Sequence, residues 1–299
     1  MINASMSYTK NYCTVIGQQM AYVEVGQGNP IVFLHGNATS SYLWRNILPY
    51  VEKQARCIAP DLLGMGDSAK LETSGPGAYS FSEQSRYLDA LLEALDVTSN
   101  VTFVAMDWGA ALGFYWAYRH PEAVKGLVYM EALVQPLTWE QWPDLPRPAF
   151  QQMRTPAGEQ MILRDNFFVE EVIPNMTVLT RHLSAEEMEA YRAPFREAGE
   201  SRRPILTLLR SLPMNGEPAD IAVVVQAYSE WLARTPVAKL FINADPGGNL
   251  TGSQREYCRT WLNQTEITVA GIHLLPEDAP NQIGTALAQW YHKRAFPNS

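Results

Sequence analysis

The N-terminal third of the chain alternates short apolar runs with longer amphipathic ones. Cys13–Ile16 and Met20–Val25 are rich in strand-forming residues and flank Gly17, which predicts an antiparallel hairpin. Continuous apolar runs follow at Pro30–His35 and Arg56–Pro60, as expected of strands that are buried on both faces of a parallel sheet. We therefore expect antiparallel strands to open a sheet that then becomes parallel.

The middle of the chain predicts a strand, a helix and a second strand joined by short connections. These elements are Val101–Met106, Ala110–Tyr118 and Lys125–Met130, in that order. A helix is expected before them over Ser82–Leu95, with Ser82 as its N-cap. The resulting β-α-β order is typical of a parallel sheet with helices packed on its faces.

Between about residues 135 and 213 the strand pattern disappears. Proline breaks, aromatic residues and helical stretches such as Ser184–Tyr191 replace it. The elements expected afterwards are a helix over Ile221–Leu232, strands over Lys239–Asn243 and Glu266–Ala270, and a closing helix over Asn281–His292. We therefore expect an α/β fold with a mostly parallel central sheet and flanking helices. Residues 1–134 and 214–299 form its core domain, and residues 135–213 form an inserted helical cap domain.

Composition narrows the class of protein. The 299 residues are 46% hydrophobic and 18% charged, which is typical of a globular chain. The net charge of −8 argues against nucleic acid or an anionic membrane as a partner, because both attract clustered Lys and Arg. The most apolar window, residues 101–118, contains Asp107, Gly109 and Gly113 and makes a poor membrane span.

The cysteines and the N-terminus bear on location. Cys13, Cys57 and Cys258 are widely spaced and include no CxxC pair, so we expect reduced thiols rather than a metal or redox site. The first ten residues lack the charged and apolar regions of a secretory signal. A cytoplasmic location is the resulting expectation.

Polar side chains stand directly after the apolar strands, where ligands bind in open α/β sheets. They are Asn37, Asp107 with its neighbour Trp108, Glu131, Asp245 and His273. Because the carboxyl ends of parallel strands share one edge of a sheet, we take these residues as the candidate site. Considered singly, Asn37 can be a turn residue and Trp108 a packing residue.

Asp107 has the sequence context of a nucleophile. The segment Ala105-Met-Asp-Trp-Gly109 places small residues two positions to either side of it, the pattern of a nucleophile elbow. A carboxylate is already anionic at neutral pH and can displace a leaving group from carbon to form an ester. Alone, Asp107 is also a good N-cap for the following helix. The elbow pattern and a histidine late in the chain favour the nucleophile.

His273 is the candidate general base. Hydrolysis of an ester on Asp107 needs a base to activate water, and His273 follows the last predicted strand. A hydrogen-bonded core histidine is its alternative role. The resulting imidazolium needs a carboxylate to orient and stabilise it, which either Glu131 or Asp245 can supply.

The sequence resembles the haloalkane dehalogenases of the α/β-hydrolase fold from about residue 12 to residue 290. The matching segments, in family order, are His35-Gly-Asn37, Ser40-Ser-Tyr-Leu-Trp-Arg-Asn46, Asp61-Leu-Leu-Gly-Met-Gly66, Asp107-Trp-Gly109, Met130-Glu131 and His273 followed by Glu277-Asp278. The Met130-Glu131 segment is similar to the subgroup whose catalytic acid follows the earlier strand.

The resemblance assigns a role to each candidate. It implies that Asp107 is the nucleophile, His273 the base and Glu131 the catalytic acid. It also implies that Asn37 and Trp108 bind the halide, and that nearby backbone N–H groups hold the oxyanion. Asp245 can instead stabilise a turn, since Pro246 and Gly247 follow it.

The implied reaction is hydrolysis of a carbon–halogen bond without a cofactor or metal, giving a primary alcohol, a halide ion and a proton. The expected partners are a small apolar halogenated substrate, a halide ion and water, with no nucleic acid or membrane, in a monomer or weak homodimer. Such a substrate needs apolar walls, for which Phe150, Phe168, Leu209 and Leu274 are candidates. Packing within the cap is their alternative role.

Three positions depart from the family pattern. Ala38 stands in place of a proline, Met106 in place of a histidine and Pro276 in place of a glutamine. Loss of the proline frees the φ angle of Ala38, so we expect a less preorganised loop around Asn37. Pro276 is expected to stiffen the loop that carries His273.

Three other functions share parts of this pattern. Epoxide hydrolases also use an Asp nucleophile, but they usually have an aromatic residue at the position of Asn37 and use cap tyrosines, for which Tyr191 is a candidate. Asn166–Glu170, Glu197–Pro204 and Phe241–Gly247 resemble coelenterazine-using luciferases, which are monooxygenases. A non-catalytic binding protein of the hydrolase fold is the third, and the intact set of catalytic residues argues against it.

Overall fold

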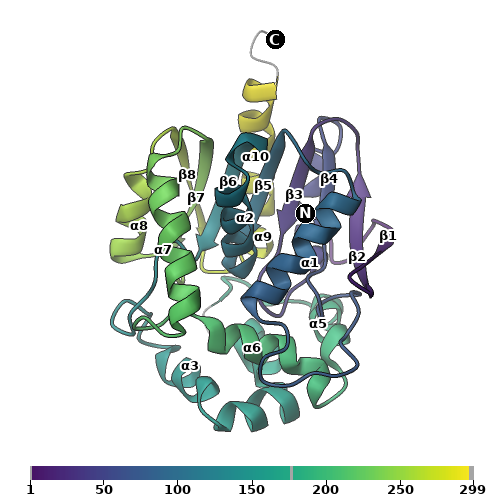
Figure 1. Cartoon of the computed structure of the whole chain (residues 1–299), viewed down its shortest axis with the longest axis vertical. Coiled ribbons are helices and arrows are strands. Elements are labelled where there is room, and N and C mark those ends of the chain that lie inside the picture. Colours follow the sequence, from purple (N-terminus) through teal and green to yellow (C-terminus); the bar gives the residue numbers. More distant parts are fainter. Residues whose placement is uncertain (1, 176–177, 296–299) are drawn as a thin grey trace.

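The computed structural model describes residues 2–175 and 178–295 and is built around an eight-stranded sheet (Figure 1). The strands are β1 Lys10–Val15, β2 Gln18–Val25, β3 Pro30–Leu34, β4 Arg56–Pro60, β5 Val101–Met106, β6 Val124–Ala132, β7 Ala238–Pro246 and β8 Gln264–Gly271. Their order across the sheet is β1-β2-β4-β3-β5-β6-β7-β8. The β1–β2 and β2–β4 pairs are antiparallel and the others are parallel, which confirms the predicted fold class.

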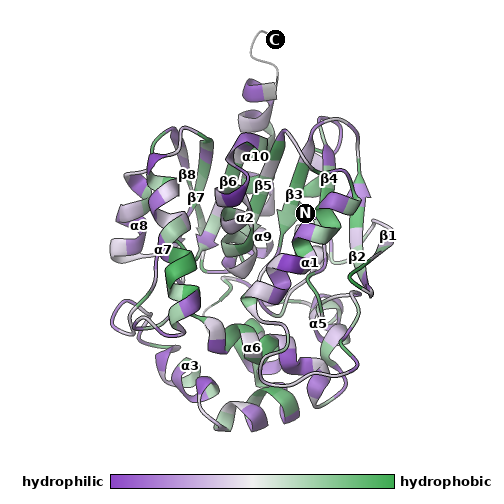
Figure 2. Ribbon diagram, in the orientation of Figure 1, coloured by the Kyte–Doolittle hydropathy of each residue, from purple (hydrophilic) through white to green (hydrophobic). Residues whose placement is uncertain are grey.

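Burial explains why the central strands are apolar along their whole length. Every residue of β3 and of β5 is buried, because helices and loops cover both faces of the sheet there. Figure 2 shows these strands in the hydrophobic colour, whereas the helices carry hydrophilic residues on their outer sides. The candidate residues that follow these strands are therefore carried at the buried centre of the sheet.

Helices before and after the strands cover the sheet. They are α1 Phe81–Ala94, α2 Asp107–Arg119, α7 Ala219–Arg234, α8 Gly252–Arg259, α9 Leu275–Asp278 and α10 Pro280–Ala295. α1, α2 and α7 lie side by side on one face, where α2 packs on β5 and β6 (Figure 1). Within the described part of the chain, no helix is long and apolar enough to cross a membrane.

Residues 135–213, here named the helical segment, contain helices that gather beyond the carboxyl ends of the strands (Figure 1). They are α3 Arg147–Arg154, the π-helices η4 Glu159–Arg164 and η5 Phe168–Val172, α4 Ile173–Asn175, α5 Ala185–Arg192, the 3-10 turns η6 Ala193–Phe195 and η7 Glu200–Arg202, and α6 Arg203–Ser211. The two ends of the segment meet, since Leu137 N–H donates to Pro213 O at 3.1 Å. The division into core and cap domains at these boundaries stays a prediction.

The expected start of the first helix was wrong. Ser80, not Ser82, is the N-cap of α1, and its hydroxyl accepts the N–H of Glu83 at 3.3 Å. The carboxylate of Glu83 in turn accepts the N–H of Tyr79 at 2.6 Å. The Ser-x-x-Glu spacing that begins at Ser80 was the signal for this cap.

The second helix also begins earlier than expected. α2 starts at Asp107 rather than at residue 110, because the turn that carries Asp107 leads into the helix without a connecting loop. Its N-cap is Met106, and no side chain caps it. The interpretation of Asp107 as a helix cap is therefore not supported. The short helices α8 and α9 were also missed by the sequence pattern.

His35 holds two segments of the core together. Its side chain is fully buried, Nδ1 donates to Gly36 O at 2.8 Å, and Nε2 accepts the N–H of Leu62 at 2.9 Å. Both contacts require the neutral ring with its proton on Nδ1. Burial accordingly lowers the pKa of His35 to about 4.

His35 should make the protein sensitive to mild acid. The unfolded chain takes up a proton at the ordinary histidine pKa of 6.5, whereas folded His35 remains neutral until about pH 4. The free energy of unfolding should therefore fall by about 2 kcal/mol between pH 7 and pH 5 on account of this residue, and it continues to fall until the pH drops below about 4. Urea unfolding of His35→Gln should show a pH dependence smaller by that amount. Equal pH dependence in the two proteins would contradict this assignment.

Candidate active site

Asp107 stands on a tight turn between β5 and α2. Its φ of 51° lies in the left-handed region, which a non-glycine residue occupies only where its surroundings hold it there. The loop after β3 supplies those surroundings: the N–H of Asn37 donates to Asp107 Oδ1 at 2.8 Å. The side chain of Asp107 is thereby fixed at the carboxyl edge of the sheet.

Two glycines make this approach possible. A Cβ atom on Gly36 would lie 2.4 Å from Asp107 Oδ1, and one on Gly109 would lie 2.3 Å from the carbonyl oxygen of Leu34. The predicted requirement for small residues around the nucleophile thus has a direct steric cause. Gly36, in the loop after β3, belongs to the same packing contact.

His273 lies between two carboxylates. Its Nδ1 is 3.1 Å from Glu131 Oε2, and its Nε2 is 3.7 Å from Asp107 Oδ2. Glu131 is buried at the end of β6, where its Oε2 also accepts the N–H of Asn249 at 2.6 Å and of Gly248 at 3.2 Å. The three side chains therefore form a line from Glu131 through the imidazole to Asp107.

Asp245 takes no part in this line. Its side chain is exposed in β7, and no hydrogen bond or ion pair joins it to His273 within residues 2–175 and 178–295. The sequence left Glu131 and Asp245 as alternatives on chemical grounds, and the structure brings only Glu131 to the imidazole.

The two carboxylates shift the pKa of His273. Burial acts to lower it, but the hydrogen bond to Glu131 and the negative charges of Asp107 and Glu131 outweigh burial and raise the pKa above its ordinary value. Part of this effect depends on Asp107 being ionised. Any chemistry that neutralises Asp107 therefore lowers the pKa of His273.

Asn37 and Trp108 lie on either side of Asp107. Both side chains are buried and line the same cavity. Asn37 Nδ2 donates one proton to Ile205 O at 3.1 Å, which leaves its second N–H for a ligand. The Trp108 ring packs against Phe81 with ring centroids 5.8 Å apart, and its indole N–H meets no acceptor among the described residues. Two N–H donors are thus placed beside Asp107.

A cavity of about 270 Å³ opens above these residues. All four residues expected as pocket walls line it, namely Phe150 of α3, Phe168 of η5, Leu209 of α6 and Leu274 beside the base. Its walls are mostly apolar, and its polar groups gather around Asp107. Such a cavity fits a small apolar molecule with one reactive polar end.

Several residues that build the site were not found from the sequence. Gly248 and Asn249 hold Glu131, Val178 O accepts the N–H of His273 at 3.0 Å, and Trp142 lines the cavity. The Pro246-Gly-Gly-Asn249 turn at the end of β7 was the signal for Gly248 and Asn249.

In the described residues, no group of three or more His, Cys, Asp or Glu is arranged to hold a metal ion.

The loop around Ala38 differs from the expectation. Ala38 has a φ of 59°, in the left-handed region. A proline ring fixes φ near −65°, so a proline could not adopt this backbone. Ala38 is therefore not simply a proline position with more freedom, and an Ala38→Pro substitution would rebuild the loop rather than preorganise it. Pro276, by contrast, lies in the first turn of α9, where proline fits.

Comparison with known proteins gives a consistent set of relatives. A family model described as the α/β hydrolase fold matches residues 29–168. A haloalkane dehalogenase of Sphingobium indicum is 51% identical to the chain, over 95% of each protein. Another from Mycolicibacterium smegmatis is 49% identical, over 93% of this chain and 89% of its own length.

Solved structures with similar folds bear related titles. The crystal structure of haloalkane dehalogenase DbeA from Bradyrhizobium elkani has a TM-score of 0.89 and 42% identity, and covers 95% of this chain and 97% of its own. That of haloalkane dehalogenase DatA from Agrobacterium tumefaciens has a TM-score of 0.89 and 32% identity, with 97% and 98% covered.

The packing of the Asp107 turn predicts a large difference between two glycines of α2. Gly109→Ala should lower the free energy of unfolding by about 1–3 kcal/mol, because the new Cβ meets backbone carbonyls that cannot move independently. Gly113→Ala is the matched control: its nearest neighbour is the Leu34 side chain at 3.2 Å, and a gain in helix propensity of up to ~1 kcal/mol offsets the crowding. Urea unfolding measures both. Equal stability of the two variants would rule out the steric requirement.

Proposed function

Since this chain belongs to the haloalkane dehalogenase family, we propose that it hydrolyses the carbon–halogen bond of small haloalkanes through an ester on Asp107. The products are a primary alcohol, a halide ion and a proton, and no cofactor takes part. The observation that carries the proposal is the line of Glu131, His273 and Asp107 at the floor of an apolar cavity. An alkyl halide offers almost nothing to hydrogen-bond, and apolar walls suit it.

In the first step Asp107 attacks the carbon that bears the halogen. An oxygen–carbon bond forms, the carbon–halogen bond breaks, and the halide leaves with the bonding electron pair. The indole N–H of Trp108 and the free amide N–H of Asn37 stabilise the charge that develops on the halide. Because the ground-state halogen carries little charge, these donors act mainly on the transition state.

In the second step His273 removes a proton from water, which attacks the carbonyl carbon of the ester. The tetrahedral intermediate then breaks the ester carbon–oxygen bond, the alkoxide takes the proton from the imidazolium and leaves as the alcohol, and the regenerated Asp107 carboxyl group loses its proton to solvent. The N–H of Asn37, which donates to Asp107 Oδ1 in the free protein, is placed to hold the oxyanion. Glu131 accepts a hydrogen bond from Nδ1–H and stabilises the imidazolium. Ester formation removes the charge of Asp107, so the pKa of His273 falls and the neutral base becomes available when it is needed.

The other candidate functions receive less support. An epoxide hydrolase needs an acid in the cavity for the epoxide oxygen, but the Tyr191 hydroxyl donates to Glu277 and this residue does not line the cavity. Oxidation of coelenterazine is a separate test, because luciferases share the catalytic residues. A cytoplasmic location and a monomer or weak homodimer stay predictions from the sequence.

Halide release tests the proposed function directly. The purified protein should release bromide from 1-bromobutane or 1,2-dibromoethane, and a series of longer bromoalkanes should show a limit set by the cavity of about 270 Å³. Absence of bromide from every member of a broad panel would refute the proposal. Light emission with coelenterazine would instead support the luciferase alternative.

The covalent route predicts a trapped intermediate. His273→Phe removes the base but leaves the nucleophile, so Asp107 should be alkylated once and should not turn over. Mass spectrometry of the quenched protein should show one added alkyl group on Asp107. Halide release by this variant with unmodified Asp107 would exclude the ester mechanism.

The geometry also predicts which carboxylate supports the base. Glu131→Gln should slow turnover on the order of 10³–10⁴-fold, because the buried imidazolium loses its stabilising charge. Asp245→Asn, at an exposed carboxylate on the neighbouring strand, should leave turnover near that of the unaltered protein. Steady-state halide release measures both variants. The reverse order of effects would assign the acid to Asp245.

A further inference from the structure

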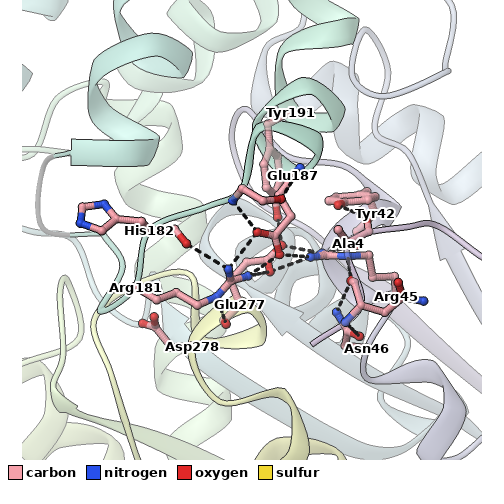
Figure 3. A network of polar contacts seen from close by, with 12 residues as sticks. Ala4, Tyr42, Arg45, Asn46, Arg181, His182, Glu187, Tyr191, Glu277 and Asp278 are labelled. Atoms are coloured by element: carbon pink, nitrogen blue, oxygen red, sulfur yellow. Dashed lines mark hydrogen bonds and ion pairs between the residues drawn. The ribbon is translucent and has the colours of Figure 1, made fainter. Parts of the chain in front are cut away.

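A buried ion cluster lies between the helical segment and the core (Figure 3). It consists of Arg45, Arg181, Glu187, Tyr191 and Glu277. Glu277 belongs to α9, and Arg45 follows the 3-10 turn η1 (Ser41–Trp44). The other three residues come from the helical segment. The cluster therefore joins parts of the chain that are far apart in sequence.

Every carboxylate oxygen of the cluster has a donor. Glu277 Oε1 accepts from Arg45 at 2.5 Å and from the hydroxyl of Tyr191. Its Oε2 accepts from Arg45 at 2.9 Å and from Arg181 at 2.7 Å. Glu187 accepts from Arg181 at 2.7 and 2.9 Å and from Arg45 at 3.0 Å. Two guanidinium groups thus balance two carboxylates with fixed geometry.

The cluster lies against residues 272–278, here named the base loop because His273 is part of it. The carbonyl oxygen of Val178 accepts the N–H groups of His273 and Leu274, both at 3.0 Å. Three residues further along, Arg181 Nε donates to the carbonyl oxygen of Glu277 at 2.8 Å. Residues 178–181 therefore run along the base loop and bind both of its halves.

Asp278 adds contacts between the same two segments. Its Oδ1 accepts the N–H of Thr180 at 2.8 Å, and its Oδ2 accepts the N–H of Ile272 at 3.0 Å. The backbone on both sides of His273 is thus held, at Ile272 from within the base loop and at Leu274 from the helical segment. The His273 ring itself makes polar contacts with Glu131 and Asp107. Whether the ring reaches both carboxylates depends on where this backbone is held.

We propose that Arg181 is a positioning residue for His273. By joining residues 178–181 to Glu277 and Glu187, it holds the base loop so that the imidazole stays between Glu131 and Asp107. The proposal rests on the proposed function, since it concerns the activation of water by His273. The helical segment then does more than form the cavity wall: it also aligns the base.

The two chemical steps depend differently on this alignment. Attack of Asp107 on carbon needs no proton transfer, so ester formation does not require the imidazole to be well placed. Attack of water does require it, because Nε2 must lie within hydrogen-bond reach of the water. Loss of the Arg181 contacts should therefore slow ester hydrolysis and leave ester formation unchanged.

Arg181 is also the member of the cluster that can be removed most safely. Its side chain is 25% exposed, whereas those of Arg45 and Glu277 are 1% and 0% exposed. Without Arg181, Arg45 still contacts both Glu187 and Glu277, so neither carboxylate is left without a cation. Removal of Arg181, Arg45 or Glu277 leaves one charge of the cluster uncompensated in each case, and this costs most at Arg45 and Glu277, whose side chains are fully buried.

The test compares Arg181→Met with Arg192→Met by rapid quenching and mass spectrometry of a single turnover of 1-bromobutane. Arg192 is a matched control: it lies in the same helical segment and binds Glu170 at 2.8 and 2.9 Å, and within the described residues it makes no hydrogen bond or ion pair with the base loop. In Arg181→Met the decay of the Asp107 ester should slow on the order of tenfold, with its formation rate unchanged. Arg192→Met should behave as the unaltered protein.

A second variant separates alignment from folding. Arg181→Lys keeps the charge but loses the forked geometry, and it should recover part of the ester decay rate. Thermal unfolding of each variant checks that it is folded. Unchanged ester decay in folded Arg181→Met, or equal slowing of both steps, would overturn the proposal. Absence of bromide release by the unaltered protein would overturn the proposed function instead.

Discussion

The close packing of the Asp107 turn against the loop after β3 is the constraint on which the site depends. Asp107 occupies a left-handed backbone conformation that is unfavourable for a side chain with a Cβ atom. The absence of a Cβ on Gly36 and on Gly109 lets the two backbones approach closely enough to hold it. The same approach brings the Asn37 N–H to Asp107 Oδ1. The strain, the hydrogen bond and the placement of the N–H donors are therefore consequences of one backbone contact.

The charges around His273 are arranged so that only one of them changes during the proposed reaction. Glu131 is buried, and its Oε2 receives two backbone N–H groups besides the imidazole, so its position and its negative charge are fixed. Asp107 carries the other charge and loses it when the ester forms. The field on the imidazole thus changes at the step where a neutral base is required. In the proposed reaction, ester formation by the substrate is therefore the event that changes the field on the imidazole.

The sequence predicts the central strands well, because one local rule, the burial of a strand on both faces of the sheet, decides their pattern of residues. Strands buried on both faces gave clear apolar runs, and most of the polar residues predicted to follow them lie together because parallel strands end at one edge of the sheet. Residue chemistry alone could not choose between Glu131 and Asp245, since they lie at the ends of neighbouring strands, and only the family resemblance favoured Glu131. The path of the loop after β8 brings His273 to Glu131. Gly248 and Asn249 act through backbone N–H groups, so their side chains gave no sign of this role and only the turn sequence Pro246-Gly-Gly-Asn249 pointed to it.

A buried ion cluster is a weak explanation for stability, because the cost of desolvating four charged groups offsets much of their attraction. It is a better explanation for geometry. Apolar side chains can slide and repack at similar energy, whereas forked guanidinium–carboxylate bonds hold only in one arrangement. The nucleophile is thus fixed by steric contact within the core, and the base by polar contacts that reach into the helical segment. The cavity walls Phe150, Phe168 and Leu209 belong to neither set of contacts. Changes in these walls can therefore alter which substrate fits without disturbing the alignment of the residues that act on it.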